Sequence, residues 1–377
     1  MKLKKFTFIL TTDCNYNCSY CPQKKEKKTI NNQTIKTTVD FFYPFLNSDD
    51  KIHIGFYGGE PLLAYEKLKH AVLLLEEKNK TGNKEITFSV TTNGSLLTEE
   101  MLDFFEHHKF TLQLSFDGLA QDKGRKKGTL KQMVRLMKRV QAHPGINFEI
   151  NSVFSPQTIG DFSASLRFII EQEGPDITFN ISTMEEWGSS DQETLKKELA
   201  ELTDFLVLYY KETGKVPVKN FQAPVADPVP GNGISGCGAG SDHMTVAPDG
   251  DLWGCFLFHD YFKTREDSSQ YQDYYFGTLT DFTVNYETRY PQIKANYTEL
   301  RQDFFQVEGG EGNFCFLCED VESCSVCPVN AAYSTGTLGK VSCRHCGLVK
   351  IQRNARKHFF TTKGTKERRE EESGQWG

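Results

Sequence analysis

Six short β-rich runs alternate with six helix-length segments before residue 213, and this alternation restricts the fold more than any other feature of the sequence. The predicted strands are residues 4–12, 52–57, 85–92, 110–116, 147–154 and 177–183, and the predicted helices are 33–46, 62–79, 98–108, 129–142, 159–173 and 191–212. Such alternation requires a parallel sheet with right-handed crossover connections. We therefore predict six β/α units that form an open sheet or a partial barrel.

The length of the chain indicates more than one domain. With 377 residues, the chain exceeds the usual size of a single domain. Residues 213–233 are rich in Pro and Gly, which is typical of a linker. We predict a core at 1–212, a linker at 213–233, a second domain at 234–350 and a flexible, charged tail at 351–377.

Composition excludes several classes of partner. The net charge of -6 argues against general binding of nucleic acid. No apolar run is long enough to cross a membrane, and the N-terminus lacks the features of a signal peptide. We therefore expect a cytoplasmic protein whose 11 cysteines are reduced and serve as metal or cluster ligands rather than disulfides.

The cysteines fall into two groups that are far apart in the sequence. Cys14, Cys18 and Cys21 follow the first predicted strand with C-x3-C-x2-C spacing, and the other eight lie between residues 237 and 346. Three thiolates on one loop would leave one iron of a 4Fe-4S cluster open to a ligand. A zinc site and unrelated buried thiols remain alternatives, although no fourth zinc ligand follows closely.

Polar and Gly-rich segments follow the other strands at the same edge of the sheet. They are Gly58-Gly59-Glu60, Thr91 to Gly94, Ser115 to Gly118, and Asn151-Ser152 near the end of the fifth strand. Reactive groups of parallel β/α folds gather at the carboxyl ends of the strands. The sequence thus predicts one site to which the cysteine loop and these segments all contribute.

The C-x3-C-x2-C loop with Tyr20 before its last cysteine resembles the signature of the radical S-adenosylmethionine (SAM) enzymes. Gly58-Gly59-Glu60 matches the GGE motif of that family, and the segments at 91–94 and 115–118 resemble its TNG and SxDG motifs. The resemblance implies a partial (β/α)6 TIM-like barrel that binds a 4Fe-4S cluster on the three cysteines, and SAM. It implies that the cluster breaks SAM to a 5'-deoxyadenosyl radical. The cofactor contacts that it implies are Tyr20, Gly58, Gly59, Glu60, Thr92, Asn93, Ser115, Asp117 and Asn151.

Two of these assignments compete with an ordinary structural role. For Ser115 and Asn151, the alternative is the capping of a strand end. Arg125 stands where relatives often carry an arginine, but the usual His-Asp pair is Gln121-Asp122 here, so Arg125 is not included among the site residues.

The second group of cysteines resembles a SPASM domain, and CGAGSDHMTVAPDGDLWGC (237–255) is close to the opening of that domain. The resemblance implies two auxiliary 4Fe-4S clusters, one on Cys237, Cys255 and Cys327, the other on Cys315, Cys318, Cys324 and Cys343. Two features depart from the pattern: C-x2-C closes it instead of C-x3-C, and Cys346 is an additional thiol that could join either cluster or stay free. His243 is expected to be a strand residue rather than a ligand. Taken alone, these cysteines also suit two zinc sites.

Enzymes that join these two domains mostly modify peptides or proteins. Our leading hypothesis is a maturase that removes a side-chain hydrogen from a ribosomally made precursor peptide and forms an oxidative modification or cross-link, with a flavodoxin or ferredoxin-type reductant. The sequence starts directly at the first strand without a leader-docking domain, so an anaerobic sulfatase-maturating enzyme is the alternative. Dehydrogenation of a small molecule or carbohydrate, an iron-sulfur electron carrier and a zinc-stabilised scaffold are further alternatives. The sequence identifies no catalytic base.

Overall fold

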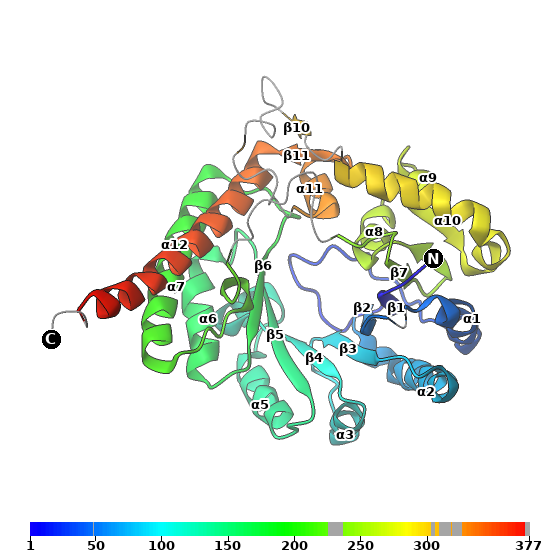
Figure 1. Cartoon of the computed structure of the whole chain (residues 1–377), viewed down its shortest axis with the longest axis horizontal. Helices are drawn as coiled ribbons and strands as arrows, with labels where there is room; N and C mark the ends of the chain where they lie inside the picture. The colour runs from blue at the N-terminus through cyan, green and yellow to red at the C-terminus, as the bar shows by residue number, and fades with distance from the viewer. Residues whose placement is uncertain (48, 225–236, 303–305, 309–317, 319–325, 374–377) are drawn as a thin grey trace.

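The computed structural model describes residues 1–47, 49–224, 237–302, 306–308, 318 and 326–373, and for 301–302, 306–308 and 364–373 it describes the backbone only. Six parallel strands form one curved sheet with helices on its outer face (Figure 1). The strands are β1 (Lys5–Thr11), β2 (Ile52–Gly58), β3 (Ile86–Thr92), β4 (Thr111–Ser115), β5 (Asn147–Phe154) and β6 (Ile177–Ile181). They pair in sequence order, which confirms the predicted β/α architecture.

The helices between the strands also follow the prediction. They are α1 (Asn32–Phe42), α2 (Tyr65–Gly82), α3 (Glu99–His107), α5 (Leu130–Gln141), α6 (Phe162–Glu171) and α7 (Ser189–Thr213). The short helix α4 (Gln121–Gly124) was not predicted. The predicted starts at residues 62 and 159 fall in short 3-10 turns that precede α2 and α6. The start of α7 is set by Asp191, whose carboxylate accepts the N–H of Gly188 at 2.8 Å, so this helix begins two residues before the predicted position.

Alternation along each strand separates the core from the interior of the barrel. Ile52, Ile54 and Phe56 of β2 are buried in the hydrophobic core beneath the helices, while His53 and Tyr57 line an internal cavity. Successive side chains of a strand point to opposite faces of the sheet, so the same short segment serves both surfaces. The outer face therefore stabilises the fold and the inner face is free to be polar.

The second domain continues the sheet instead of standing apart from it. β7 (His243–Val246) pairs in parallel with β1, and β8 (Asp251–Trp253) and β9 (Tyr275–Thr278) add antiparallel strands beyond it. The other elements are α8 (Phe256–Phe262), α9 (Tyr271–Tyr274), α10 (Leu279–Gln302), β10 (Gln306–Glu308), α11 (Pro328–Thr335), β11 (Lys340–Ser342) and α12 (Cys343–Ser373). The hydrogen bonds between β1 and β7 thus fix the second cysteine group relative to the barrel.

Part of the segment predicted to be a linker is packed. Val218 forms a bridge with Ile177 of β6, and Val218 and Phe221 are fully buried. The Pro and Gly content of residues 213–233 did not reveal these two apolar anchors. Residues 225–233 of the predicted linker lie outside the described residues, and the domain boundaries themselves stay a prediction.

The prediction of a flexible tail at 351–377 is wrong for its first part. α12 continues to Ser373 beside α7 (Figure 1), and Phe359 is fully buried against Phe221, with ring centroids 5.5 Å apart. Ile351, Ala355 and Phe359 recur every four residues and form the inner face of the helix. The many charges around these three residues concealed that face in the sequence.

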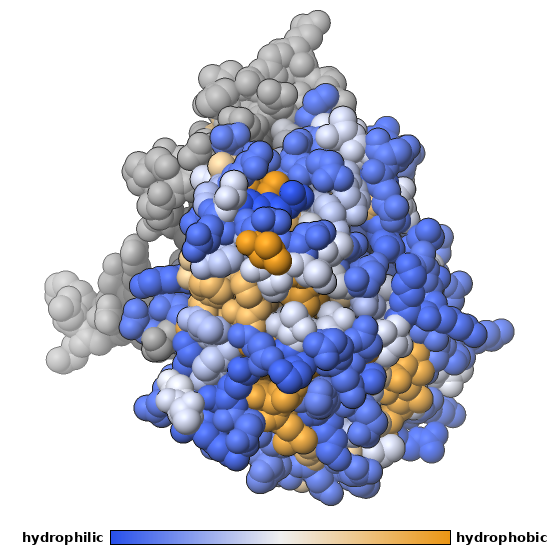
Figure 2. Space-filling view, turned by 90° about the vertical axis from the view of Figure 1, so that its right-hand side faces the viewer, coloured by the Kyte–Doolittle hydropathy of each residue, from blue (hydrophilic) through white to orange (hydrophobic). Residues whose placement is uncertain are grey.

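One face of the molecule shows few large apolar areas (Figure 2). On the side that carries α1, α2 and α10, hydrophilic residues predominate and hydrophobic ones form small, separate patches (Figure 2). Among the described residues, none of the helices has the length and apolar character to cross a membrane.

Candidate active site

A cavity of about 710 Å³ occupies the interior of the barrel and reaches the second domain. Its wall at the carboxyl ends of the strands contains Cys14, Cys18 and Cys21, so the three thiols share one space. Phe256 and Tyr333 of the second domain complete the same wall. The cavity therefore brings together the two cysteine-bearing parts of the chain.

The cysteine loop between β1 and α1 is held by backbone contacts rather than by regular structure. Thr12 N–H donates to the carbonyl of Lys28 at 3.0 Å, and Ser19 N–H donates to Gly124 at 3.0 Å. Lys25 Nζ donates to the carbonyl of Tyr16 at 2.6 Å and closes the loop on itself. These anchors tie the loop to its own base and to the segment after β4.

The three thiols form no disulfide and are partly buried. Burial raises the pKa of each thiol, while Lys25 and, for Cys18, Arg125 oppose that rise. Thiolates bind iron, and basic neighbours favour the thiolate form. The donor set therefore fits a cluster held by three thiolates. In the described part of the chain, no three His, Cys, Asp or Glu side chains gather closely enough to hold one metal ion.

Gly58 and Gly59 allow the turn after β2 to lie directly against the cysteine loop. A Cβ at Gly58 would come within 2.3 Å of the carbonyl oxygen of Thr11, and one at Gly59 within 2.2 Å of that of Asp13. The N–H of Gly59 donates to Thr11 and that of Glu60 donates to Asp13, each at 2.9 Å. Only glycine permits this approach, so the two glycines determine how closely the cysteine loop packs against the turn after β2.

Glu60 is buried behind that turn and joins it to the segment after β3. Its carboxylate accepts hydrogen bonds from Thr92 Oγ1 (2.6 Å), the N–H of Asn93 (2.8 Å) and the N–H of Leu62 (3.0 Å). Burial raises the pKa of Glu60, and these three donors oppose that rise. Asn93 also donates from Nδ2 to Asn15 Oδ1 at 2.9 Å. Glu60 thus positions cavity residues without lining the cavity itself.

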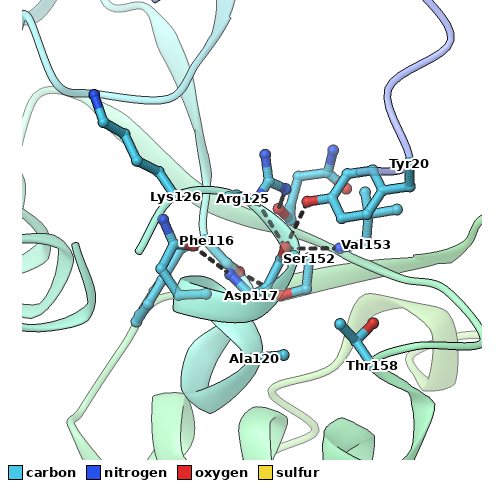
Figure 3. Close-up of polar contacts among 12 residues, drawn as sticks. Tyr20, Phe116, Asp117, Ala120, Arg125, Lys126, Ser152, Val153 and Thr158 are labelled. Atoms are coloured by element: carbon cyan, nitrogen blue, oxygen red, sulfur yellow. Dashed lines mark hydrogen bonds and ion pairs between the residues drawn. The ribbon is translucent and has the colours of Figure 1, made fainter. Parts of the chain in front are cut away.

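Asp117 forms a second buried network, after β4 (Figure 3). Its carboxylate accepts from Tyr20 Oη at 2.5 Å and from the N–H of Val153 at 2.9 Å. Arg125 Nε lies 2.9 Å from Asp117 Oδ2 in an ion pair without hydrogen-bond alignment, and both side chains are buried. Arg125 also donates to the carbonyl of Asn151 at 3.2 Å.

Arg125 and Asp117 together fix Tyr20. The guanidinium carbon of Arg125 lies 5.5 Å from the centroid of the Tyr20 ring, a cation–π contact. Burial raises the pKa of Tyr20 well above its ordinary value, so its hydroxyl stays protonated and donates to Asp117. The ring, which forms part of the cavity wall, is thereby held from both its face and its hydroxyl.

The residues predicted as cofactor contacts divide into two sets. Seven line the cavity: Tyr20, Gly58, Gly59, Thr92, Asn93, Ser115 and Asn151. Glu60 and Asp117 lie behind this wall and hold it through the networks described above. Asn151 Oδ1 accepts from Asn180 Nδ2 at 2.7 Å. The role of each residue as a cofactor contact stays a prediction.

Sequence reasoning missed three residues of the wall. Arg125 was set aside because its neighbours differ from the usual pattern, yet it lines the cavity and pairs with Asp117. Tyr57 precedes the Gly58 turn, where the alternation of β2 could have identified it. Tyr333 lies on α11, far along the chain, and no signal in the sequence pointed to it.

In the second domain, Cys237, Cys255 and Cys327 lie near one another. Burial raises the pKa of the Cys255 thiol, and Cys327 and Cys237 raise it further. These are the three residues predicted to share the first auxiliary cluster. Of the other five, Cys318, Cys343 and Cys346 are described and Cys315 and Cys324 lie outside the described residues. His243 opens β7, as predicted.

Comparisons with known proteins show what the N-terminal part of the chain is similar to. Residues 8–169 match the model of the radical SAM superfamily. Over 118 residues the chain is 30% identical to an uncharacterised protein of Methanocaldococcus jannaschii (31% of this chain, 40% of the relative). Over 114 residues it is 29% identical to a cysteine-type anaerobic sulfatase-maturating enzyme of Clostridium perfringens strain 13 (29% of this chain, 31% of the relative). The matched regions thus span less than half of each of these curated relatives.

Solved structures extend the likeness in fold over nearly the whole chain. Native anSMEcpe with bound AdoMet and the Cp18Cys peptide has a TM-score of 0.74 at 19% identity and covers 96% of this chain and 99% of that one. Streptococcus suis SuiB bound to its precursor peptide SuiA has a TM-score of 0.58 at 15% identity, over 88% and 73% of the two chains. At these identities the likeness establishes the fold.

Proposed function

We propose that this chain, a radical SAM enzyme whose family domain spans residues 8–169, modifies a side chain of a peptide or protein that enters its cavity. The observation that carries the proposal is the shared cavity, walled by Cys14, Cys18 and Cys21 on one side and by Phe256 and Tyr333 of the second domain on another. A substrate group in this space would lie between the two cysteine-bearing domains.

The residues of the barrel would hold the cofactors as follows. Cys14, Cys18 and Cys21 would hold a 4Fe-4S cluster, which together with SAM would supply a 5'-deoxyadenosyl radical for hydrogen abstraction. The backbone of the Gly58 turn and the side chains at 92–93 and 115 would orient SAM. The buried Glu60 and Asp117 networks would keep these contacts in place while the ligand binds and leaves.

The second cysteine group would hold auxiliary 4Fe-4S clusters, which could accept the electron that the oxidised substrate gives up. Cys237, Cys255 and Cys327 lie near one another, and we assign them to one auxiliary 4Fe-4S cluster. A second cluster on Cys315, Cys318, Cys324 and Cys343 or Cys346 completes the proposal. A flavodoxin or ferredoxin-type protein would reduce the SAM-binding cluster at Cys14, Cys18 and Cys21.

Two peptide-modifying reactions are supported by different observations. Maturation of a ribosomally made precursor peptide is our leading assignment, and the fold that the chain shares with SuiB, which was solved with its precursor peptide, supports it. Sulfatase maturation is the second candidate, supported by the relatives of that name and by the higher TM-score to anSMEcpe. Both would use the same cavity and the same radical.

The first experiment compares the wild type with a Cys14→Ala/Cys18→Ala/Cys21→Ala variant after anaerobic iron-sulfur reconstitution. We expect about twelve irons per wild-type chain and about eight in the variant, because one of three clusters is removed. Release of 5'-deoxyadenosine with dithionite should occur in the wild type only. Zinc in place of iron, or equal nucleoside release by both proteins, would refute the assignment.

A second experiment separates the two reactions. The reconstituted enzyme is incubated with SAM, dithionite and a sulfatase-type peptide that carries Cys or Ser at the target position, and products are analysed by mass spectrometry. Conversion to formylglycine would establish sulfatase maturation. Nucleoside release without any change in either peptide would exclude it and leave the precursor-peptide reaction.

A further inference from the structure

Two tyrosines from different domains lie at the boundary between the barrel and the second domain. Tyr57 is the inward residue before the Gly58 turn of β2, and Tyr333 lies on α11; both line the cavity. Cys21 and Asp260 raise the pKa of both phenols in addition to burial, so both rings lie near the cysteine loop. Cys255 contributes to the shift of Tyr57 as well, which places this ring between the two cysteine groups.

Neither hydroxyl has a hydrogen-bond partner among the described residues. The Tyr333 oxygen is buried and unpaired, and no described donor or acceptor contacts the Tyr57 oxygen. A buried polar group without a partner costs about 1–3 kcal/mol. A buried hydroxyl left unpaired on a cavity wall, as at Tyr333, is typical of a site whose ligand supplies the missing acceptor.

Packing prevents both rings from turning toward another partner. Tyr57 packs at a tilt against Phe256 of α8, with ring centroids 4.1 Å apart. Tyr333 packs edge-on against Tyr261 at 5.2 Å, and Arg265 covers its face at 5.4 Å. The hydroxyls are therefore held in fixed positions at the cavity wall, as a binding site requires.

The hydrogen-bonding groups of the cavity wall indicate which class of ligand it binds. Phenols are protonated at neutral pH, so both tyrosines offer a hydrogen to an oxygen. The Asp260 carboxylate, which accepts from Gln23 Nε2 at 3.2 Å, lies nearby and disfavours an anion. Asn330, one turn before Tyr333 on α11, lines the same wall and its side chain contacts no described hydrogen-bonding group, so it can accept an N–H.

We propose that Tyr57 and Tyr333 donate hydrogen bonds to the carbonyl oxygen of one uncharged main-chain amide of the substrate, while Asn330 accepts the N–H of a neighbouring amide. The inference rests on the proposed function and narrows it, because the ligand bound here is the backbone of a peptide rather than a carboxylate, phosphate or sugar acid. Main-chain recognition holds a peptide beside Cys21 whatever its side chains are.

The test uses N-acetylalanine methylamide as a minimal peptide and ligand-observed NMR titration of the full-length, reconstituted protein with SAM and no reductant. We expect Tyr333→Phe and Tyr57→Phe each to weaken binding of the amide about fivefold, since each loses one hydrogen bond of about 1 kcal/mol. N-acetylalanine, which carries a carboxylate instead of the second amide, should bind the wild type about tenfold more weakly than the methylamide.

Tyr65→Phe is the matched control, because the Tyr65 hydroxyl is also buried and unpaired but lies on α2, away from the cavity wall. This variant should bind the amide as the wild type does. Neither Tyr333→Phe nor Tyr65→Phe should lower the thermal midpoint, because neither removes a bond within the protein. A fall of several degrees in Tyr333→Phe alone would show that its hydroxyl serves the fold, which contradicts the inference.

The remaining outcomes also decide the matter. No measurable binding of the methylamide by the wild type, unchanged affinity in both cavity variants, or equal affinity for the carboxylate would overturn the inference. An enzyme that releases 5'-deoxyadenosine but binds no amide refutes only this site. A protein that binds the amide through both tyrosines but releases no nucleoside refutes only the proposed reaction.

Discussion

Glu60 and Asp117 occupy equivalent places in the fold but are stabilised in different ways. Each follows a strand, each is almost completely buried, with exposed fractions of 1% and 0%, and each holds a wall of the cavity. Glu60 accepts three hydrogen bonds from uncharged groups of its own turn and of the segment after β3. Asp117 instead faces a guanidinium, Arg125, as well as a phenol and a backbone N–H.

The difference predicts unequal consequences when either carboxylate is replaced. Removing a hydrogen-bond acceptor leaves an unpaired dipole, whereas removing one member of a buried ion pair leaves an unpaired charge. The Glu60 network should therefore tolerate change better than the Asp117 network. Substitutions at both positions and at their neighbours test this ordering.

Asp117→Asn should have the largest effect. It leaves the buried Arg125 without its counter-charge, and loss of one partner of a buried ion pair costs about 3–5 kcal/mol. We expect the free energy of unfolding, from urea titrations followed by circular dichroism, to fall by that amount. Asp40→Asn is the control, because Asp40 pairs with Lys36 and Lys78 but its side chain is 41% exposed, and it should cost less than about 1 kcal/mol. Equal losses of unfolding free energy in Asp117→Asn and Asp40→Asn would show that burial of the ion pair has no effect.

His53 resembles Glu60 in this comparison, because its hydrogen-bond partners are uncharged. Its Nε2 lies 2.8 Å from Ser89 Oγ, and burial, followed by the Lys5 and His243 charges, lowers its pKa to about 4. The unfolded chain therefore binds more protons between about pH 6.5 and 4, so stability falls as the pH decreases through this window. His53 should therefore make the free energy of unfolding about 2–3 kcal/mol lower at pH 4 than above pH 6.5, after allowance for its partial exposure.

Urea titrations at several pH values measure this contribution. His53→Gln should make the dependence of unfolding free energy on pH flatter by that amount, since Gln keeps a hydrogen-bonding group but does not titrate. His107→Gln, which replaces an exposed histidine, should leave the slope unchanged. If His53→Gln and the wild type have the same slope, the barrel interior does not exclude the charged imidazole.

Glu60→Gln should have a smaller effect than either. Oε1 of Glu60 accepts from both Leu62 and Thr92, and Oε2 accepts from Asn93. The amide of Gln provides only one acceptor oxygen, so one donor faces an NH2 group and about 1–2 kcal/mol is lost.

Glu198→Gln is the matched control for this substitution. Glu198 is buried too, but it accepts a single backbone hydrogen bond, from Ser163 at 2.8 Å, which Gln can also accept. Its unfolding free energy should stay within about 0.5 kcal/mol of the wild type. A loss at Glu198 equal to that at Glu60 would mean that burial of the carboxyl matters and the number of its donors does not.

The sequence predicted the strands of the barrel well because two signals agree there. Apolar residues at alternate positions of β2 fit a strand whatever surrounds it, and the Gly58 turn ends it. The packed face of α12 was missed because three apolar residues, Ile351, Ala355 and Phe359, are spread among charges. Their burial depends on α7 and Phe221, which are more than a hundred residues away.

The site was predictable only where its residues are consecutive. The spacing of Cys14, Cys18 and Cys21 and the Gly58-Gly59-Glu60 turn are local patterns, and the three cysteines and two glycines line one cavity. The division between lining and supporting residues was not visible, since Glu60 and Asp117 resemble ligand contacts in a motif and only the fold shows their partners. Tyr333 joins the cavity through a tertiary contact that no local pattern encodes.

Arg125→Lys gives the smallest effect and separates charge from shape in the Asp117 network. Lysine keeps a positive charge near Asp117, so the cost of an unpaired carboxylate is avoided. It loses the planar guanidinium that lies over Tyr20 and donates to Asn151, a change worth about 1 kcal/mol. Urea titration should therefore place Arg125→Lys near Glu60→Gln and far above Asp117→Asn in stability. The unfolding free energy of Arg125→Lys could instead be as low as that of Asp117→Asn. In that case Glu60 and Asp117 differ in the geometry of their hydrogen-bond donors, and the charge of Arg125 does not explain the difference.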